Sequence, residues 1–126
     1  MLDTLKMVVF VPTTDYERAR PFYEEVLGLR FITSDGFALI FEANGVTVRV
    51  VKAPEFQPAR YTIVGWEVPD IHDAVRTLEG RGVAFERYGF FEQDELGVWT
   101  APSGDKVAWF KDPDGNTLSV SQHVRE

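Results

Sequence analysis

Few side chains in this sequence could bind a metal ion or transfer a proton. The chain has no cysteine and two histidines, so disulfide bonds and thiolate chemistry are excluded. His72 falls in the first turn of a predicted helix, and His123 follows the last predicted strand, where chain ends fray. Glu42 and Glu67 lie in predicted strands and could bind a cation, but neither has a histidine partner. We therefore expect no metal site at these residues.

Arg49 and Glu67 offer a second kind of chemistry. Arg49 lies inside a predicted strand, and an inward-pointing guanidinium must be paired because an unpaired buried charge is costly. Its partner would be Glu67, another acid or an anionic group of a ligand; alternatively, the side chain extends to the rim of a cavity. Glu67 near a pair of hydroxyl side chains would allow acid–base catalysis without a metal.

A hairpin over residues 109–122 is the strongest local pattern among the elements that position these side chains. Its turn is Asp112-Pro-Asp-Gly-Asn116, in which proline sets one backbone angle and Asp-Gly-Asn tolerate positive φ. The strand after the turn carries hydroxyl side chains on one face.

The rest of the chain predicts two copies of one unit. Each copy has a strand, a helix and further strands, and the helices begin at Asp70 in the second copy and at Thr14 or Asp15 in the first. Pro21 should kink the first helix or lie near its start. The predicted strands are Lys6–Val11, Leu29–Thr33, Phe37–Glu42, Val46–Val51, Tyr61–Val68 and Val83–Tyr88, followed by an insertion, Phe90–Gly97, and the closing hairpin.

This self-similarity predicts an α+β fold of two tandem βαβββ modules in a single domain, 1–126. Module 1 covers about residues 1–52, a linker about 53–60, and module 2 about 61–126. The entry to the first helix, its end Phe22-Tyr-Glu-Glu-Val-Leu-Gly28, the second helix and the Asp112–Asn116 turn resemble the vicinal oxygen chelate superfamily. This superfamily includes glyoxalases, extradiol dioxygenases and bleomycin-resistance proteins. The resemblance implies a curled mixed sheet around a central cup-shaped cavity.

The resemblance also implies where metal ligands would lie, on the first and last strands of each module. The corresponding positions hold Val8, Arg49, Ile63 and Ser119. Metal sites of this kind need histidine and carboxylate donors, which these four side chains do not supply. We therefore expect no metal and no cofactor.

Strand alternation predicts what would line the cavity instead. Hydroxyl, apolar and charged side chains should face it together, and Gly65 leaves space among them. Aromatic residues bracket the insertion, which would make it a lid or stacking platform, although such residues also anchor loops or complete dimer interfaces. The predicted ligand-binding residues are Val8, Phe10, Arg49, Ile63, Gly65, Glu67, Trp99, Trp109, Ser119 and Ser121.

Composition limits the partners. Thirteen basic and twenty acidic side chains give a net charge of −7, which argues against nucleic acid. No apolar run is long enough to span a membrane, and the absence of cysteine fits a cytoplasmic protein. The resemblance implies a homodimer, because two-module chains of this superfamily commonly pair about a two-fold axis, and exposed strand edges also need covering.

Three functions fit these patterns. The first is a metal-free protein of the bleomycin-resistance kind that holds an aromatic or cationic small molecule in the cavity. The alternative is a lyase, isomerase or dioxygenase-like enzyme with an atypical site. The third is a regulatory or structural dimer whose cavity has lost its role.

Overall fold

A computed structural model describes residues 1–125, and its contacts divide the chain into two compact units. The first unit covers residues 1–57 and the second begins at Pro58, so the boundary lies within the predicted linker. Each unit is a βαβββ module with a four-stranded mixed sheet, which confirms the predicted α+β class. The sheets are separate and do not close. The central cup depends on how the modules combine and stays a prediction.

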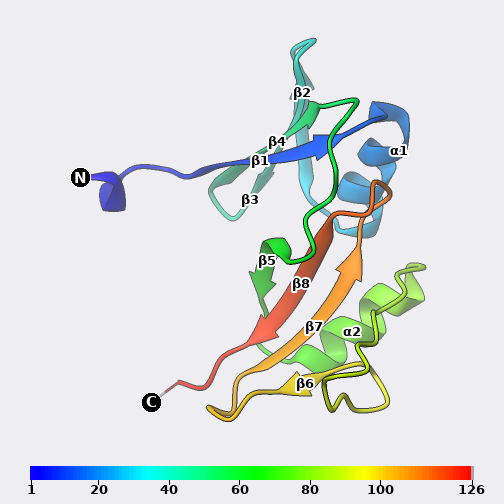
Figure 1. Cartoon of the computed structure of the whole chain (residues 1–126). Coiled ribbons are helices and arrows are strands. Elements are labelled where there is room, and N and C mark those ends of the chain that lie inside the picture. The colour runs from blue at the N-terminus through cyan, green and yellow to red at the C-terminus, as the bar shows by residue number, and fades with distance from the viewer. Residues whose placement is uncertain (126) are drawn as a thin grey trace. The chain divides into compact units, whose positions relative to one another are not determined.

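Each unit has one strand, a helical segment and then three strands, as the repeat predicts (Figure 1). The first unit contains η1 (Leu2–Thr4), β1 (Val8–Thr13), α1 (Tyr16–Pro21), the π-helical turn η2 (Phe22–Val26), β2 (Arg30–Ser34), β3 (Ala38–Ala43) and β4 (Val46–Lys52). The second unit contains β5 (Thr62–Glu67), α2 (Ile71–Gly80), β6 (Trp99–Thr100), β7 (Lys106–Lys111) and β8 (Thr117–Gln122). None of the helices among the described residues has the length and apolar character that a membrane crossing requires.

The first helix changes geometry at its proline, which explains the irregular pattern there. Asp15 is the N-cap, and its carboxylate accepts a hydrogen bond from the Glu17 N–H at 2.9 Å. The α-helix ends at Pro21, which has no N–H to donate to the preceding turn, and π-type hydrogen bonding follows. Gly28 then ends the helix with a positive φ of 76°. The predicted kink is therefore a switch from α to π geometry.

Both sheets have the same order of strands. In the first unit the order is β1-β4-β3-β2, and in the second it is β5-β8-β7-β6. The pairs β1–β4 and β5–β8 are parallel, and the remaining pairs are antiparallel. In the second unit α2 packs on β7 and β8, so one face of that sheet is buried beneath the helix (Figure 1).

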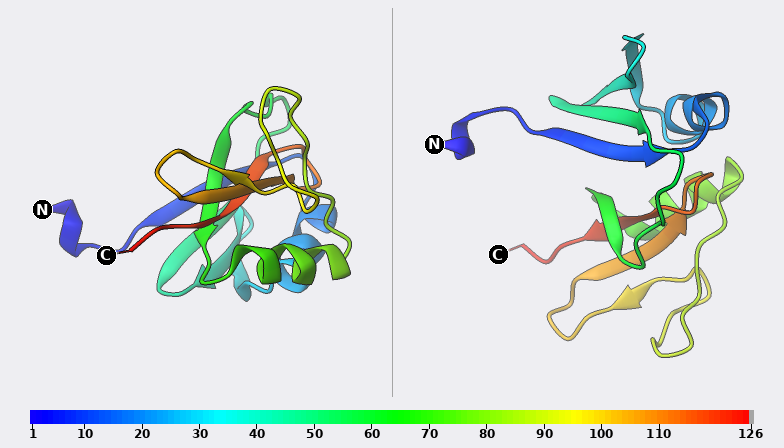
Figure 2. Two further views of the ribbon diagram at one scale, coloured as in Figure 1. Left: turned by 90° about the horizontal axis from the view of Figure 1, so that it is seen from below. Right: turned by 45° about the horizontal axis from the view of Figure 1, so that its top comes forward.

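The edge of the second sheet differs from the prediction of a strand at Val83–Tyr88. Only Phe85 forms an isolated bridge there, opposite Phe110, and the short strand β6 completes the edge further along β7. The backbone leaves the edge after Glu86, whose N–H donates to the Trp109 carbonyl, and enters the insertion. The Tyr88 N–H is then bonded to a side chain of the insertion and not to β7. The long loop that results is visible beside β6 in Figure 2.

Candidate functional site

Five aromatic rings form a continuous cluster in the second unit. The rings of Phe91 and Trp109 are parallel within 3° at 5.3 Å, and Trp99 lies 4.8 Å from Phe91. Tyr88 stacks on Phe90 at 5.7 Å and meets Trp109 edge-on at 5.4 Å. We call these five residues the aromatic cluster. Offset and edge-to-face contacts at such distances stabilise a rigid apolar surface.

Strand alternation explains why the cluster lies on the face of the sheet away from α2. Ala108 and Phe110 of β7 are fully buried on the helix side, so Trp109 between them points to the other face. Across the sheet Trp109 is paired with Ser119, and Ser119 with Gly65. The cluster therefore borders the small residues of β8 and β5.

The amide of Gln93 holds the insertion that supplies Phe90 and Phe91. Its Oε1 accepts from the Tyr88 N–H at 2.7 Å, and its Nε2 donates to the carbonyls of Glu86 and Gly97. One side chain thus closes both ends of the loop. Arg87 adds two hydrogen bonds from its guanidinium to the backbone carbonyls of Asp94 and Glu95.

Asp94 ties the same loop to the helix. Its Oδ1 accepts from the backbone N–H groups of Leu96 and Val98, and its Oδ2 lies 2.7 Å from His72 Nε2 in α2. Partial burial raises the pKa of Asp94, but the hydrogen bonds from His72, Val98 and Leu96 outweigh burial and lower the pKa below its ordinary value. His72 is therefore an anchor of this loop.

Acidification should release this anchor. Because the folded-state pKa of Asp94 lies below its ordinary 3.8, its contribution to stability is complete above that pH and is lost as the pH falls through the folded-state value. The protection factors of the Leu96 and Val98 amides, which correct for the slower intrinsic exchange in acid, should therefore fall on acidification, while amides in the middle of β8 stay protected. Asp94→Asn, which keeps Oδ1 but cannot accept through Nδ2, should show faster exchange already at neutral pH. Equal exchange in both proteins would contradict the assignment.

A hollow of about 410 Å³ opens beside the aromatic cluster. The Phe90 ring is 80% exposed and Tyr61 is 71% exposed, so apolar surface is presented to solvent here. Burial and the charge of Glu86 raise the pKa of the Tyr88 phenol, which keeps it a neutral donor. The lining residues are Arg60, Tyr61, Thr62, Tyr88, Phe90, Phe91, Trp109 and Thr117.

The polar groups at this hollow are few. Lys111 Nζ donates to Thr117 Oγ1 at 2.7 Å, and the Thr117 hydroxyl in turn lies 3.4 Å from the carbonyl of Ala59. A mostly aromatic wall with a few hydroxyl and cationic groups is typical of sites for small organic molecules.

Gly65 leaves space for the Ser119 side chain where β5 passes β8. A Cβ at this position would lie 2.7 Å from Ser119 Oγ and 3.4 Å from the Ser119 carbonyl oxygen. Gly65→Ala should therefore lower the free energy of unfolding by about 1–2 kcal/mol through overpacking. Urea unfolding measures this change. In a Ser119→Ala background the clash with Oγ is gone, so the same substitution should cost less than half as much. Equal costs in both backgrounds would place the strain elsewhere.

The structure divides the predicted ligand residues between the units. Val8, Phe10 and Arg49 belong to the first, where Val8 is paired with Thr47 and Phe10 with Arg49 across β1 and β4. Phe10 is exposed. The remaining residues lie in the second unit, where Trp99, Trp109, Ser119, Gly65, Glu67 and Ser121 occupy neighbouring positions of one sheet, and Ile63 lies at an irregularity of β5.

Arg49 and Glu67, the two charged residues predicted to bind the ligand, each form an ion pair within their own unit. Arg49 Nη2 lies 2.9 Å from Asp35 Oδ2, so another acid satisfies this guanidinium. The hydrogen bond from the Phe37 N–H, then that from Arg49, and then that from the Ala38 N–H lower the pKa of Asp35. Glu67 is paired with Arg125.

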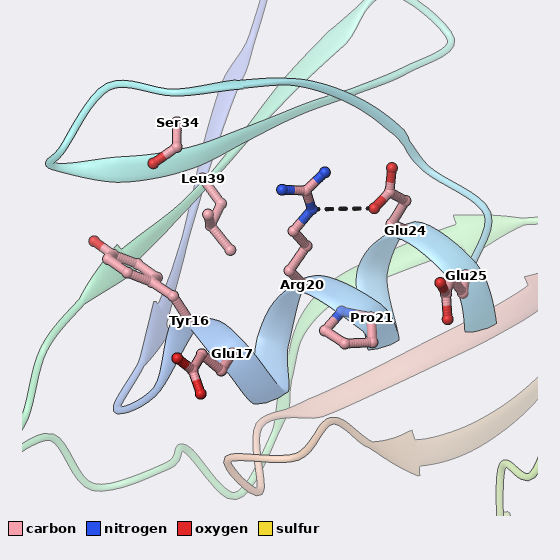
Figure 3. Close-up of a pocket in the computed structure, with 8 residues that line it drawn as sticks. All are labelled: Tyr16, Glu17, Arg20, Pro21, Glu24, Glu25, Ser34 and Leu39. Carbon is pink, nitrogen blue, oxygen red and sulfur yellow. Dashed lines mark hydrogen bonds and ion pairs between the residues drawn. The ribbon is translucent and has the colours of Figure 1, made fainter.

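A hollow of about 440 Å³ in the first unit is a second candidate (Figure 3). Arg20 points into it from α1, pairs with Glu24 at 3.1 Å and lies 3.7 Å over the ring of Phe31. The Tyr16 hydroxyl donates to the Phe37 carbonyl at 2.9 Å. These polar groups are already paired within the unit, so we place the candidate site at the aromatic cluster.

The side chains do not fit the divalent metal that the resemblance implies. Among residues 1–125, no three His, Cys, Asp or Glu side chains gather where they could hold an ion. At the implied ligand positions Arg49 is a cation bound to Asp35, Val8 and Ile63 are apolar, and the Ser119 hydroxyl faces Gly65. A cation and two hydrocarbon side chains cannot serve as donors.

Sequence patterns missed part of this site. Tyr61, Tyr88 and Thr62 line the hollow but were not predicted as ligand residues. The spacing of Tyr88 and Phe90 was the available signal, although Tyr88 was assigned to the end of a strand that does not form and Phe90 to the insertion that follows it.

Two comparisons with known proteins bear on this chain. Residues 4–120 match the family model described as Glyoxalase/Bleomycin resistance protein/Dioxygenase superfamily. Comparison with curated proteins finds no sequence match.

Several solved structures share the fold. A member of the glyoxalase/bleomycin resistance protein/dioxygenase superfamily from Sphaerobacter thermophilus is 22% identical, with a TM-score of 0.74 over 98% of this chain and 100% of that chain. Lactoylglutathione lyase from Agrobacterium tumefaciens is 17% identical, with a TM-score of 0.72 over 94% of this chain and 93% of that chain. At these identities the likeness shows the fold and does not extend to an activity.

Proposed function

The chain belongs to the glyoxalase/bleomycin resistance protein/dioxygenase superfamily, and we propose that it binds an aromatic organic molecule without a metal. The observation that carries this proposal is the aromatic cluster with the hollow of about 410 Å³ beside it. In this respect the protein would resemble the bleomycin-resistance branch of the superfamily.

The rings are arranged to extend a stack. Phe91 lies parallel to Trp109, while the Phe90 ring, in contact with Phe91 at 4.6 Å, is largely exposed. A flat ligand would cover this exposed apolar surface and add one more ring contact, each worth roughly 0.5–1.5 kcal/mol beyond burial. The walls therefore favour a planar aromatic group over a flexible aliphatic one.

Charge supports a neutral or cationic ligand over an anionic one. Acidic side chains outnumber basic ones from residue 58 onward, and Glu86, Glu92 and Glu95 lie in or next to the insertion. Arg60 lines the hollow as a local cation and Lys111 is bonded to Thr117, so the preference for cations rests on the acidic excess of the unit and not on the lining. The long-range field of the unit thus attracts cations.

Three naphthalene probes of matched size separate stacking from charge. Titration with 2-naphthylmethylammonium, 2-naphthol and 2-naphthalenesulfonate should quench tryptophan fluorescence saturably, with affinity falling in that order. Cyclohexylmethylammonium, which keeps the charge without the ring, should bind at least tenfold more weakly than its naphthyl counterpart. Linear quenching by all three naphthalenes, without saturation, would overturn the proposal.

A metal-dependent lyase, isomerase or dioxygenase-like enzyme is the alternative within the superfamily. It would need donors that the implied ligand positions lack. Equilibrium dialysis against Zn²⁺, Ni²⁺, Mn²⁺ and Fe²⁺ should show no stoichiometric tight binding. One tightly held equivalent of any of these ions would contradict the metal-free proposal while leaving the aromatic site to be tested by the naphthalene titrations.

A further inference from the structure

A serine, a histidine and an aspartate form a hydrogen-bonded relay at the end of the second sheet, apart from the aromatic cluster. Ser121 Oγ lies 2.9 Å from His123 Nε2, and His123 Nδ1 lies 3.0 Å from Asp105 Oδ2. A carboxylate can only accept, so Nδ1 carries the proton and donates it to Asp105. In the neutral imidazole Nε2 is then the acceptor for the Ser121 hydroxyl.

The ends of two paired strands bring these residues together. Ser121 lies in β8 and His123 directly follows that strand, and two-residue spacing in extended chain puts both side chains on one face. Asp105 directly precedes β7, whose first residue Lys106 is paired with Gln122. The relay is therefore a consequence of the β7–β8 register.

The backbone fixes the carboxylate of Asp105 for this contact. Its Oδ1 accepts from the Val124 N–H at 2.8 Å, which leaves Oδ2 for the imidazole. The Val124 N–H and His123 lower the pKa of Asp105, in that order, so the carboxylate stays ionised. Gly104 lets the turn approach the chain end, because a Cβ there would lie 2.9 Å from a Val124 methyl group.

We propose that Ser121, His123 and Asp105 are a hydrolytic triad that cleaves small esters of phenols. Ser121 Oγ would attack the ester carbonyl carbon while His123 Nε2 takes the hydroxyl proton. Collapse of the tetrahedral intermediate breaks the bond to the phenolate, which leaves with that proton, and the acyl group stays on Ser121. Water, deprotonated by the same imidazole, then attacks the acyl carbonyl and releases a carboxylic acid and the free serine.

The surroundings of Ser121 set the substrate class. Val107 lies opposite Ser121 on β7, and Trp99 lies opposite Val107 on β6, so apolar and aromatic side chains continue the row from the serine. An aryl leaving group can rest on this row. On the other side Glu67 of β5 is paired with Ser121 of β8, and Glu67 forms an ion pair with Arg125.

The relay is accessible to a small ester. The side chains of His123 and Asp105 are 37% and 33% exposed, so solvent and substrate reach the imidazole. The triad residues lie outside the hollow of the proposed ligand site, although the row that would hold the leaving group shares Trp99 with the aromatic cluster. Covalent labelling of Ser121 therefore tests the triad separately from the naphthalene titrations.

Labelling with a fluorophosphonate probe is the first test. Because such probes react with activated serines, peptide mass spectrometry should find the label on Ser121 in the wild-type protein. His123→Asn should reduce that labelling by about 10²-fold, since general-base assistance has that order of effect. Absence of label, or label on a different serine, would overturn the proposal.

Hydrolysis of p-nitrophenyl acetate separates the triad from nonspecific attack by a surface imidazole. Ser121→Ala should lower the rate by about 10²-fold although His123 is intact, whereas direct attack by the imidazole would survive this change. Ser34→Ala, at an exposed strand position of the first unit, should leave the rate unchanged. Wild-type rates in Ser121→Ala would overturn the proposal.

Asp105 acts as a positioning residue, and its test is the split between kcat and KM. In Asp105→Asn, an amide nitrogen in the place of Oδ2 could not accept the proton of His123 Nδ1. We therefore expect kcat to fall at least tenfold while KM changes less than twofold. A change in KM alone, with kcat retained, would exclude this role. Circular dichroism of each variant confirms that the fold persists.

Discussion

Trp109→Ala should weaken binding of 2-naphthylmethylammonium by about 30-fold, or about 2 kcal/mol, the loss typical of a central aromatic contact. Trp109 is the ring on which the cluster is built: it lies parallel to Phe91 at 5.3 Å and meets Tyr88 at 5.4 Å. Its removal takes away one wall of the hollow and the support for the neighbouring rings. Isothermal titration calorimetry measures the change.

Two variants control this prediction. Trp109→Phe keeps a ring at the same position and should lose less than about threefold in affinity, because stacking is retained. Phe37→Ala removes an exposed aromatic ring from the first unit and should leave the affinity unchanged. If Trp109→Ala binds the probe like the wild type while its circular dichroism is native, the ligand site lies elsewhere.

Asp112→Ala should lower the free energy of unfolding by about 3 kcal/mol, because it leaves several buried donors without partners. Asp112 is 6% exposed, and its carboxylate accepts from the backbone N–H groups of Asp114 and Asn116 and from Asn116 Nδ2, each at 2.9 Å. Asn116 is 1% exposed, so water cannot replace these bonds without opening the turn. Urea unfolding gives the midpoint and slope that measure this loss.

Comparison with two further variants identifies the cause. Asp112→Asn retains an oxygen for the backbone N–H groups but turns an NH₂ group toward Asn116 Nδ2. It should therefore lower the free energy of unfolding less than Asp112→Ala does. Asp73→Asn changes a carboxylate in the exposed first turn of α2 and should cost less than about 0.5 kcal/mol. An unchanged midpoint in Asp112→Ala would show that the turn does not depend on its carboxylate.

Local patterns predicted most of the fold correctly. The Asp15 and Asp70 caps and the Asp112–Asn116 turn form as their residue types require. In each case the deciding contacts join residues a few positions apart, so they can be recognised in a linear sequence. The same patterns failed at Val83–Tyr88, where the backbone leaves the sheet edge and bonds the side chain of Gln93 in the insertion.

The sequence by itself determined the α+β modules, the face on which Trp109 and Ser119 lie, and the absence of donors at the implied metal positions. Only the tertiary structure decided which side chains meet: Phe91 with Trp109, Arg49 with Asp35, and His123 with Asp105. These pairs depend on strand register and on the path of the insertion between strands. Such contacts join distant parts of the chain, and their partners are selected by packing rather than by the spacing of residues.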